Sequence, residues 1–165
     1  MDANMDPLVL LRNEHEEIRT FLNKFEEYLK KISSNIPDEE KNNLISGLKE
    51  LALYFDKDLE QHLKREEGAL FPVLGNYIGI ETGPINVMII EHNHCRDLSG
   101  GFKTKINNFY ADNDYKGLAN AGISLSRLLS EHEDKEDHIL FNMAEMHLSK
   151  NEKKDIAEKI LTINI

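Results

Sequence analysis

The sequence contains histidines and glutamates with the types and spacing of metal ligands. In two places a glutamate follows a histidine by four residues, His62 with Glu66 and His132 with Glu136. An α-helix has about 3.6 residues per turn, so each pair would lie on one helix face, one turn apart. Imidazole nitrogens and carboxylate oxygens are ligands of iron, zinc and manganese. Together with two similarly placed histidines, the predicted metal ligands are His15, His62, Glu66, His92, His132 and Glu136.

The motifs that contain these residues occur twice. The pattern E-H-x-x-x-R is found at residues 14–19 and 91–96, and H-x-x-[KR]-E-[ED]-x-x-L-F at residues 62–71 and 132–141. We interpret the chain as two helical hairpins of one design, each of which supplies two histidines and one glutamate. If the hairpins pack about a pseudo-two-fold axis, two metal ions would share the glutamates as bridges and take two histidines each.

Each predicted ligand interrupts a stripe of apolar residues at intervals of three and four, which is the pattern of an amphipathic helix. The stripes predict long helices over about residues 8–29, 44–70, 85–109 and 118–143. Pro7, Pro37 and Pro84 stand where three of these helices should start, a position that proline favours. Pro72 is expected to end or kink the second helix, and residues 75–83 to form an irregular connection.

Short connections between long amphipathic helices favour an all-α fold, an antiparallel up-down-up-down four-helix bundle over about residues 6–147. Residues 111–114 are predicted to be a turn. A capping box at Ser149 and Glu152 predicts a short C-terminal fifth helix over about residues 150–162. Sustained apolar alternation, the signal of a strand, is not found. A length of 165 residues suits one domain, predicted over residues 1–165.

A buried carboxylate without a partner costs several kcal/mol, so polar residues within apolar stripes need an explanation. One metal site in the bundle interior accounts for all of the predicted ligands together. The remaining histidines, His94, His138 and His147, fall away from the ligand face or too far along the helix to join it. We expect Cys95, which lies on an apolar stripe, to be a small core residue.

Charged residues near the predicted ligands have two interpretations. Arg19 and Arg96 each follow a predicted histidine ligand by one turn. They either pair with Glu67 or Asp137 around the site, or form surface salt bridges. Asp58, one turn before a predicted ligand, either supports the site or is solvated.

The composition excludes several classes of function. Apolar residues make up 40% and charged residues 30% of the chain, and the net charge is −10. This charge argues against nucleic acid or an anionic membrane surface as a partner. The apolar runs are far shorter than the ~20 residues that span a bilayer, and the N-terminus lacks a basic and then apolar signal, so we expect a cytoplasmic protein. A single cysteine excludes an internal disulfide.

The motifs resemble those of the hemerythrin-like HHE cation-binding family. The resemblance rests on residues 62–72, 91–96 and 132–141 and extends over about residues 8–145. It implies an antiparallel four-helix bundle with a non-haem di-iron centre held by the six predicted ligands. Oxygen-carrying hemerythrins differ, because they have a histidine at the position of Arg96 and an aspartate five residues after the fourth-helix histidine. Asp137 has that offset, but the internal match to Glu66 favours Glu136, and the missing histidine argues against reversible oxygen carriage.

These features predict a cofactor of two iron ions, while manganese or zinc would suit the same ligands. The first functional hypothesis is a di-iron protein that binds or reacts with O2, NO or peroxide in oxygen or nitrosative stress. The alternatives are a non-catalytic iron or oxygen sensor, an iron-centre repair protein, and a bundle with a structural metal. The sequence leaves the oligomeric state open, and also whether the chain is an enzyme, since it has no nucleophile, phosphate-loop or nucleotide motif.

Overall fold

A computed structural model describes residues 5–163, and the chain is helical along nearly all of this part. The α-helices are α1 (Pro7–Ile32), α2 (Asp38–Tyr54), α3 (Glu60–Arg65), α4 (Phe71–Ile78), α5 (Pro84–Asn107), α6 (Phe109–Asp112), α7 (Tyr115–Lys135), α8 (Phe141–His147) and α9 (Lys150–Thr162). Three π-helical turns join some of them, η1 (Phe55–Leu59), η2 (Glu66–Leu70) and η3 (Glu136–Leu140). No strand occurs between residues 5 and 163, which confirms the predicted all-α class. The predicted domain range also includes residues 1–4 and 164–165, which lie outside the described part.

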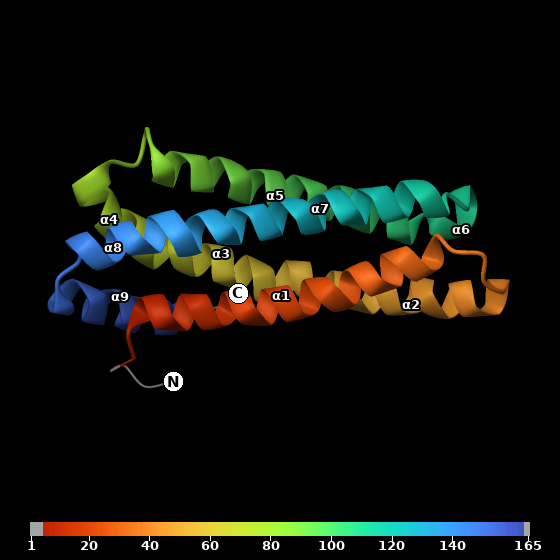
Figure 1. Cartoon of the computed structure of the whole chain (residues 1–165), viewed down its shortest axis with the longest axis horizontal. Coiled ribbons are helices and arrows are strands. Elements are labelled where there is room, and N and C mark those ends of the chain that lie inside the picture. The colour runs from red at the N-terminus through yellow and green to blue at the C-terminus, as the bar shows by residue number, and fades with distance from the viewer. Residues whose placement is uncertain (1–4, 164–165) are drawn as a thin grey trace.

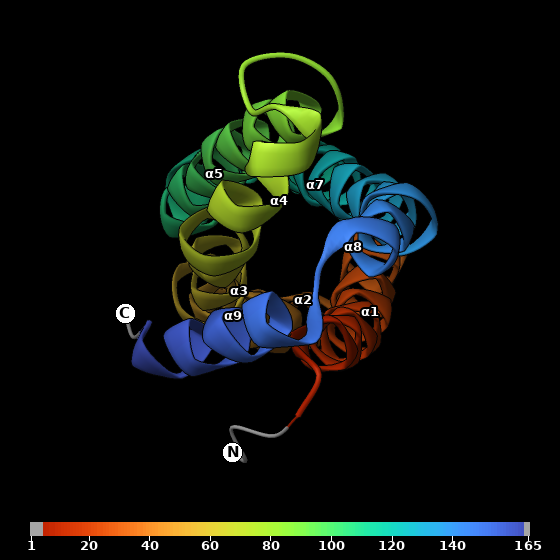
Figure 2. The ribbon, with the colours of Figure 1, turned by 90° about the vertical axis from the view of Figure 1, so that its left-hand side faces the viewer.

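The long helical segments lie side by side along one axis (Figure 1). These segments are α1, the continuous run from α2 to α4, α5, and the run from α7 to α8, and each runs opposite to the one before it in the chain. α7 packs against both α1 and α5, and α2 also contacts α1 and α5. Seen along the axis, the segments surround a common interior, and α9 crosses one end over α1 and α3 (Figure 2).

The helix boundaries follow local capping chemistry. The Asp6 side chain accepts a hydrogen bond from the Leu8 N–H at 2.9 Å, just before Pro7. Ser149 and Glu152 form the predicted capping box at the start of α9. Such side chains satisfy backbone donors that the first helical turn leaves unpaired. The predicted starts of α1 and α9 are therefore confirmed.

Pro72 was predicted to end or kink the second helix, and it does not end it. The segment continues through α4 to Ile78, so only residues 79–83 of the predicted connection are irregular. Pro72 follows the π-helical turn η2, in which hydrogen bonds reach one residue further along the chain than in an α-helix. This local change of register allows a residue without an N–H to follow inside the helical segment. The predicted turn at 111–114 is likewise shorter, because α6 extends to Asp112.

The apolar core consists of two clusters along the bundle. One contains Ile18 and Cys95, and the other Leu11 and Met88. The predicted ligands on α1 and α5 lie between these residues in sequence, so the metal-ligand layer separates the clusters. The apolar stripe of the helix predicted over residues 118–143 includes Ile139, which the sequence therefore predicts to be buried, but Ile139 is 50% exposed and this prediction is wrong. The π-helical turn η3 contains an extra residue per turn, and this shift turns Ile139 outward.

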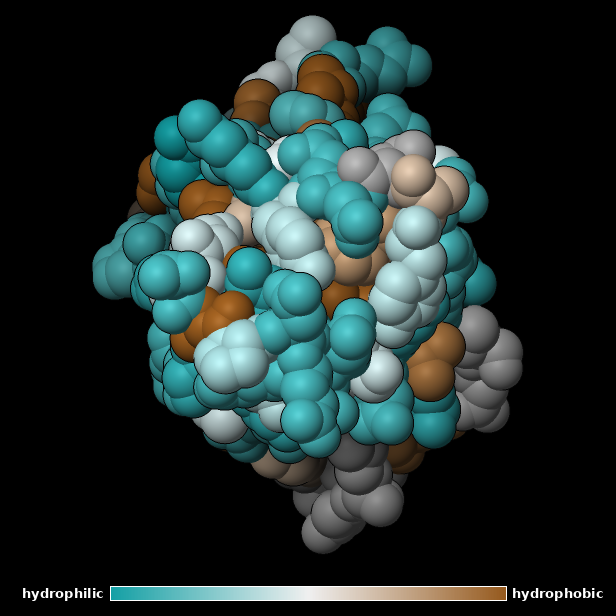
Figure 3. Space-filling view, turned by 90° about the vertical axis from the view of Figure 1, so that its right-hand side faces the viewer, coloured by the Kyte–Doolittle hydropathy of each residue, from teal (hydrophilic) through white to brown (hydrophobic). Residues whose placement is uncertain are grey.

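The surface of the bundle that Figure 3 shows is largely polar, in agreement with the high share of charged residues in the sequence. The end of the bundle with α6 and the connection from α1 to α2 is mainly hydrophilic (Figure 3). Within the described part of the chain, the helices are too short or too polar to cross a membrane.

Candidate metal centre

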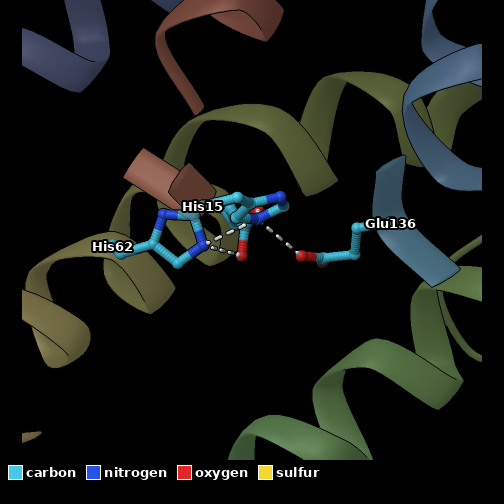
Figure 4. Close-up of side chains that lie close together, drawn as sticks. His15, His62 and Glu136 are labelled. Carbon is cyan, nitrogen blue, oxygen red and sulfur yellow. Dashed lines mark hydrogen bonds and ion pairs between the residues drawn. The ribbon is translucent and has the colours of Figure 1, made fainter. Parts of the chain in front are cut away.

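The structure brings all six predicted ligands together in the interior of the bundle. Their side chains are almost completely buried. The possible ligand atoms form two groups, and within each group all of the atoms lie within 4.8 Å of one another. One group consists of His15, His62, Glu66 and Glu136, and the other of Glu66, His92, His132 and Glu136. Each group takes both its histidines from one half of the chain, and the two groups share both glutamates. Figure 4 shows His15, His62 and Glu136 directed toward one another.

The histidines meet in pairs through their Nε2 atoms. The Nε2 atoms of His15 and His62 are 3.2 Å apart, and those of His92 and His132 are 3.1 Å apart. In each pair the rings are inclined by 68° with centroids 4.8 Å apart. The two pairs therefore have nearly the same geometry, as the internal sequence repeat predicts.

Each glutamate makes its shortest contacts with one histidine from each half. Glu136 Oε2 lies 3.3 Å from the Nε2 atoms of both His15 and His132. Glu66 Oε2 lies 3.4 Å from the Nε2 atoms of both His62 and His92. The carboxylates thus stand between the histidine pairs, which is the position that bridging ligands require.

The π-helical turns position these glutamates. Glu66 is the first residue of η2, and Glu136 is the first residue of η3. π-Helical turns inside α-helices are rare and occur frequently at functional sites. They occur here directly after the helical turns that carry His62 and His132, so local backbone geometry repeats along with the ligands.

A carboxylate holds the Nδ1 atom of each predicted histidine ligand. The Nδ1 atom of His15 lies 3.0 Å from Asp137, and the Nδ1 atom of His62 lies 2.9 Å from Glu14. In the second half, the Nδ1 atom of His92 lies 2.7 Å from Glu67, and the Nδ1 atom of His132 lies 3.1 Å from Glu91. An Nδ1–H donor bound in this way leaves the Nε2 lone pair free for a metal and fixes the ring. Every carboxylate in this layer comes from a different helical segment than its histidine.

The arginines that were predicted to pair with Glu67 or Asp137 do so. Arg96 Nη1 donates to Glu67 at 2.9 Å, and Arg19 Nη2 donates to Asp137 at 2.5 Å. Arg12 also donates to Asp137, at 3.0 Å. Glu14 and Glu91 contact the cationic side chains of Arg65 and Lys135. The sequence reasoning missed Glu14 and Glu91, although their signal was present as the repeated glutamate of the E-H motifs.

These contacts shift the acidities of the outer carboxylates. Burial raises the pKa of Glu67, but hydrogen bonds from His92 and Arg96 outweigh burial and lower it to about 2. Burial is likewise outweighed at Asp137, where hydrogen bonds from His15 and Arg19 lower the pKa to about 2. Both carboxylates are therefore ionised at neutral pH and able to accept hydrogen bonds.

The inner groups have contrasting protonation preferences. Burial and the neighbouring charge of Glu136 raise the pKa of Glu66 well above its usual range. Burial lowers the pKa of His15, but Asp137 and Glu136 outweigh it and raise the pKa to about 9. Burial lowers the pKa of His62 to about 4. In the metal-free protein, bound protons thus offset the buried negative charge of the glutamates. A metal cation would replace these protons.

The glutamate oxygens provide the test of whether a metal fits. Both carboxylate oxygens of Glu66 and both of Glu136 are buried and have no hydrogen-bond partner in the part of the chain that the structure describes. Unpartnered buried carboxylates are strongly unfavourable and normally bind a proton, a cation or a metal. Four orphan oxygens beside four imidazole nitrogens form a donor set that fits iron or another transition metal.

Glu133 is a buried carboxylate near the site that the sequence reasoning missed. Its side chain is 1% exposed, and Arg19 Nε lies 3.3 Å from its Oε2 atom. Burial raises its pKa to about 7, although His15 and Arg19 oppose this shift. Leu63 stands at the equivalent position of the repeat, so the internal match provided no signal for an acid here.

The other residues singled out in the sequence lie outside this site. His94, His138 and His147 are exposed, which agrees with the prediction that they do not join the ligands. Asp58 is exposed, which supports its interpretation as a solvated residue. Cys95 is fully buried, and burial raises the pKa of its thiol to about 12.

Comparison with known proteins agrees with the helical fold. Residues 6–144 match the model of the hemerythrin HHE cation binding domain. The chain therefore belongs to the hemerythrin HHE cation-binding family.

The chain is also similar to curated proteins named iron-sulfur cluster repair protein YtfE. That of Salmonella schwarzengrund is 31% identical over 110 residues, which are 64% of this chain and 50% of that protein. The protein of Escherichia coli O81 is 31% identical and that of Escherichia fergusonii 30% identical, each with the same coverage. The chain thus spans about half the length of the curated relatives it matches.

Proposed function

We propose that this protein binds two iron ions in its interior and functions in the repair of iron–sulfur clusters. The first iron would be held by His15 and His62 and the second by His92 and His132. Glu66 and Glu136 would bridge both ions. The helical segments that carry these ligands would form one up-down-up-down four-helix bundle within a single domain.

The observation that carries the proposal is the set of four unpartnered carboxylate oxygens of Glu66 and Glu136, enclosed by histidine Nε2 atoms. The ligand atoms form two groups of four, and within each group they lie within 4.8 Å of one another, which suits two ions better than one. Histidine with carboxylate favours iron over magnesium or calcium, which prefer oxygen alone. Bound iron would supply either redox chemistry or iron itself for transfer.

The repair role is supported by the relatives named for it. The aligned 110 residues are 64% of this chain, and the family match extends through both motif repeats. Among the sequence-based hypotheses, this finding favours iron-centre repair over the binding of O2, NO or peroxide. The protein's own residues would hold iron through neutral Nε2 atoms, and Asp137, Glu14, Glu67 and Glu91 would keep those rings oriented.

The experiment that tests the proposal combines metal analysis with a repair assay. Anaerobically purified protein should contain two irons per chain and show a visible spectrum of a bridged di-iron site. Mixed with an iron–sulfur enzyme whose cluster has been damaged by peroxide, it should restore enzyme activity and lose iron in proportion.

Two variants make the result specific. Glu66→Ala should contain little iron and restore no activity, whereas Glu50→Ala, at an exposed position on α2, should behave as the unmodified protein does. Two zinc ions per chain in place of iron would contradict the metal assignment. Full iron content without any recovery of the damaged enzyme would contradict the repair role.

A further inference from the structure

The two halves of the bundle differ in how the surface beside each glutamate-bearing turn is covered. In the first half, α9 packs against both α1 and η2. Ile156 and Ile160 of α9 belong to the same apolar cluster as Leu10 and Ala69. At Gly68, a Cβ atom would lie only 2.9 Å from Ile163 Cδ1, so the glycine permits close approach of the C-terminal segment.

The repeat identifies the matching surface in the second half. Val87 precedes Glu91 by four residues, as Leu10 precedes Glu14, and Ile139 follows His132 by seven residues, as Ala69 follows His62. The surface between α5 and η3 is therefore the pseudo-symmetric counterpart of the surface that α9 covers. It forms a groove of about 250 Å³ lined by Pro84, Val87, Met88, Lys135, Ile139 and Leu140.

The two equivalent surfaces differ sharply in exposure. Leu10 is 5% exposed and Ala69 is 0% exposed, whereas Val87 is 43% and Ile139 50% exposed. Apolar side chains line both surfaces, but among the described residues no helix corresponding to α9 lies over α5 and η3. A groove that is lined by apolar side chains and open to water is typical of an interface.

We infer that α5 of a second copy of this chain occupies this groove and forms a two-fold symmetric dimer. α5 supplies the apolar helix itself, because Val87 and the neighbouring Ile90, which is 58% exposed, project from it. In a two-fold dimer each α5 would lie in the groove of the other copy, so one surface provides both partners of the contact. The partner's helix would then cover η3 as α9 covers η2.

Charge also favours this surface for self-association. Each copy carries a net charge of −10, so two copies repel, and a contact surface without acidic side chains keeps that repulsion smallest. Lys135 is the only charged residue among those that line the groove, and its ammonium group contacts Glu91. The remaining lining is apolar, and burying it would not leave an unpaired charge.

The test measures the mass of the metal-loaded protein by sedimentation over a wide range of concentrations. The unmodified chain should be a dimer at high concentration. Ile139→Glu and Val87→Glu should each weaken dimerisation on the order of a hundredfold or more, because the symmetric contact would bury each new charge twice. Leu53→Glu, at a 67% exposed leucine on α2, is the matched control and should leave the dimer intact.

The inference does not rest on the proposed function, and metal content and helix content measured on the same samples keep the two separate. Two substitutions are used so that either can decide if the other fails to fold. A monomer at every concentration would overturn the inference, and so would a dimer unaffected by both groove substitutions. Equal disruption by Leu53→Glu would overturn it as well, because the effect would then be one of added charge alone.

Discussion

The π-helical turns η2 and η3 carry equivalent glutamates but lie in different surroundings. On their inner sides they match, because Glu66 and Glu136 are both fully buried and each makes its shortest contacts with one histidine from each half. On their outer sides η2 is covered by α9, whereas η3 exposes Ile139. Since the inner residues share one cluster of ligand atoms, a change in either half would disturb both. The outer surfaces make no common contact and are free to differ.

Between these inner and outer sides lie the carboxylates that contact the histidine Nδ1 atoms, and their contacts are only partly symmetric. His15 and His92 are equivalent in the repeat, and each is held by a carboxylate that an arginine also contacts. Asp137 receives hydrogen bonds from a second arginine, Arg12. The comparison therefore predicts equal effects for changes at the glutamates and increasingly unequal effects further from the site.

The largest expected effect is the loss of metal after removal of either glutamate. Glu66→Ala and Glu136→Ala should each lower the metal content to well below two ions per chain, since either substitution removes a ligand from both positions. Metal analysis after gel filtration measures this, with Glu50→Ala as the control. Retention of two metals by either variant would break the equivalence of η2 and η3 and show that the ligand assignment is wrong.

The carboxylates that hold the histidines should have smaller and unequal effects. Glu67→Gln and Asp137→Asn should each weaken metal binding by about 10- to 100-fold, the usual effect of changing a residue that orients a ligand. The loss should be greater for Asp137→Asn, because that substitution also removes an ionic partner from two arginines, Arg12 and Arg19. Competition with a chelator of known affinity measures both values.

The exposed Asp134 provides the control for this pair, and Asp134→Asn should bind metal as tightly as the unmodified chain. A greater loss of metal affinity for Glu67→Gln than for Asp137→Asn would contradict the expected order. It would mean that the carboxylate contacted by one arginine matters more for metal binding than the carboxylate contacted by two.

How far the sequence predicted this structure depends on the kind of signal. The stripes of α1 and α5 were predicted correctly because one regular helical period runs through each. The exposure of Ile139 was not predicted, because a π-helical turn changes the period locally and no residue pattern indicates it, and for Pro72 the sequence left two outcomes, an end or a kink. The roles of Glu14 and Glu91 required knowledge of which helices face each other, since each holds a histidine on another segment. The predicted ligands came together as expected because the repeat specified both halves at once.

Covering of the outer surface by α9 should contribute measurably to stability. Ile160→Ala should lower the free energy of unfolding by about 2–5 kcal/mol, the usual result of removing a fully buried isoleucine side chain. Ile139→Ala on the uncovered side is the matched control and should change it by less than about 1 kcal/mol in dilute solution. Urea denaturation of both variants measures the difference. Similar losses in both would mean that η3 is as well covered as η2.

The last expected effect is confined to the metal-free protein and concerns Glu133, whose repeat counterpart is Leu63. Because burial raises the pKa of Glu133 to about 7, the unfolded chain releases this proton first as the pH rises. The stabilising effect of the protonated group is complete below about pH 4.5 and is lost as the pH rises through 7, on the order of 3 kcal/mol in total.

In the metal-free protein, Glu133→Gln should remove this part of the pH dependence, so its advantage in stability over the unmodified chain should grow between pH 4.5 and pH 8. Chemical denaturation at several pH values measures that advantage, and Glu131→Gln, at an exposed position, serves as the control. A difference that stays constant with pH would mean that Glu133 remains ionised throughout and that the pairing with Arg19, rather than burial, sets its pKa.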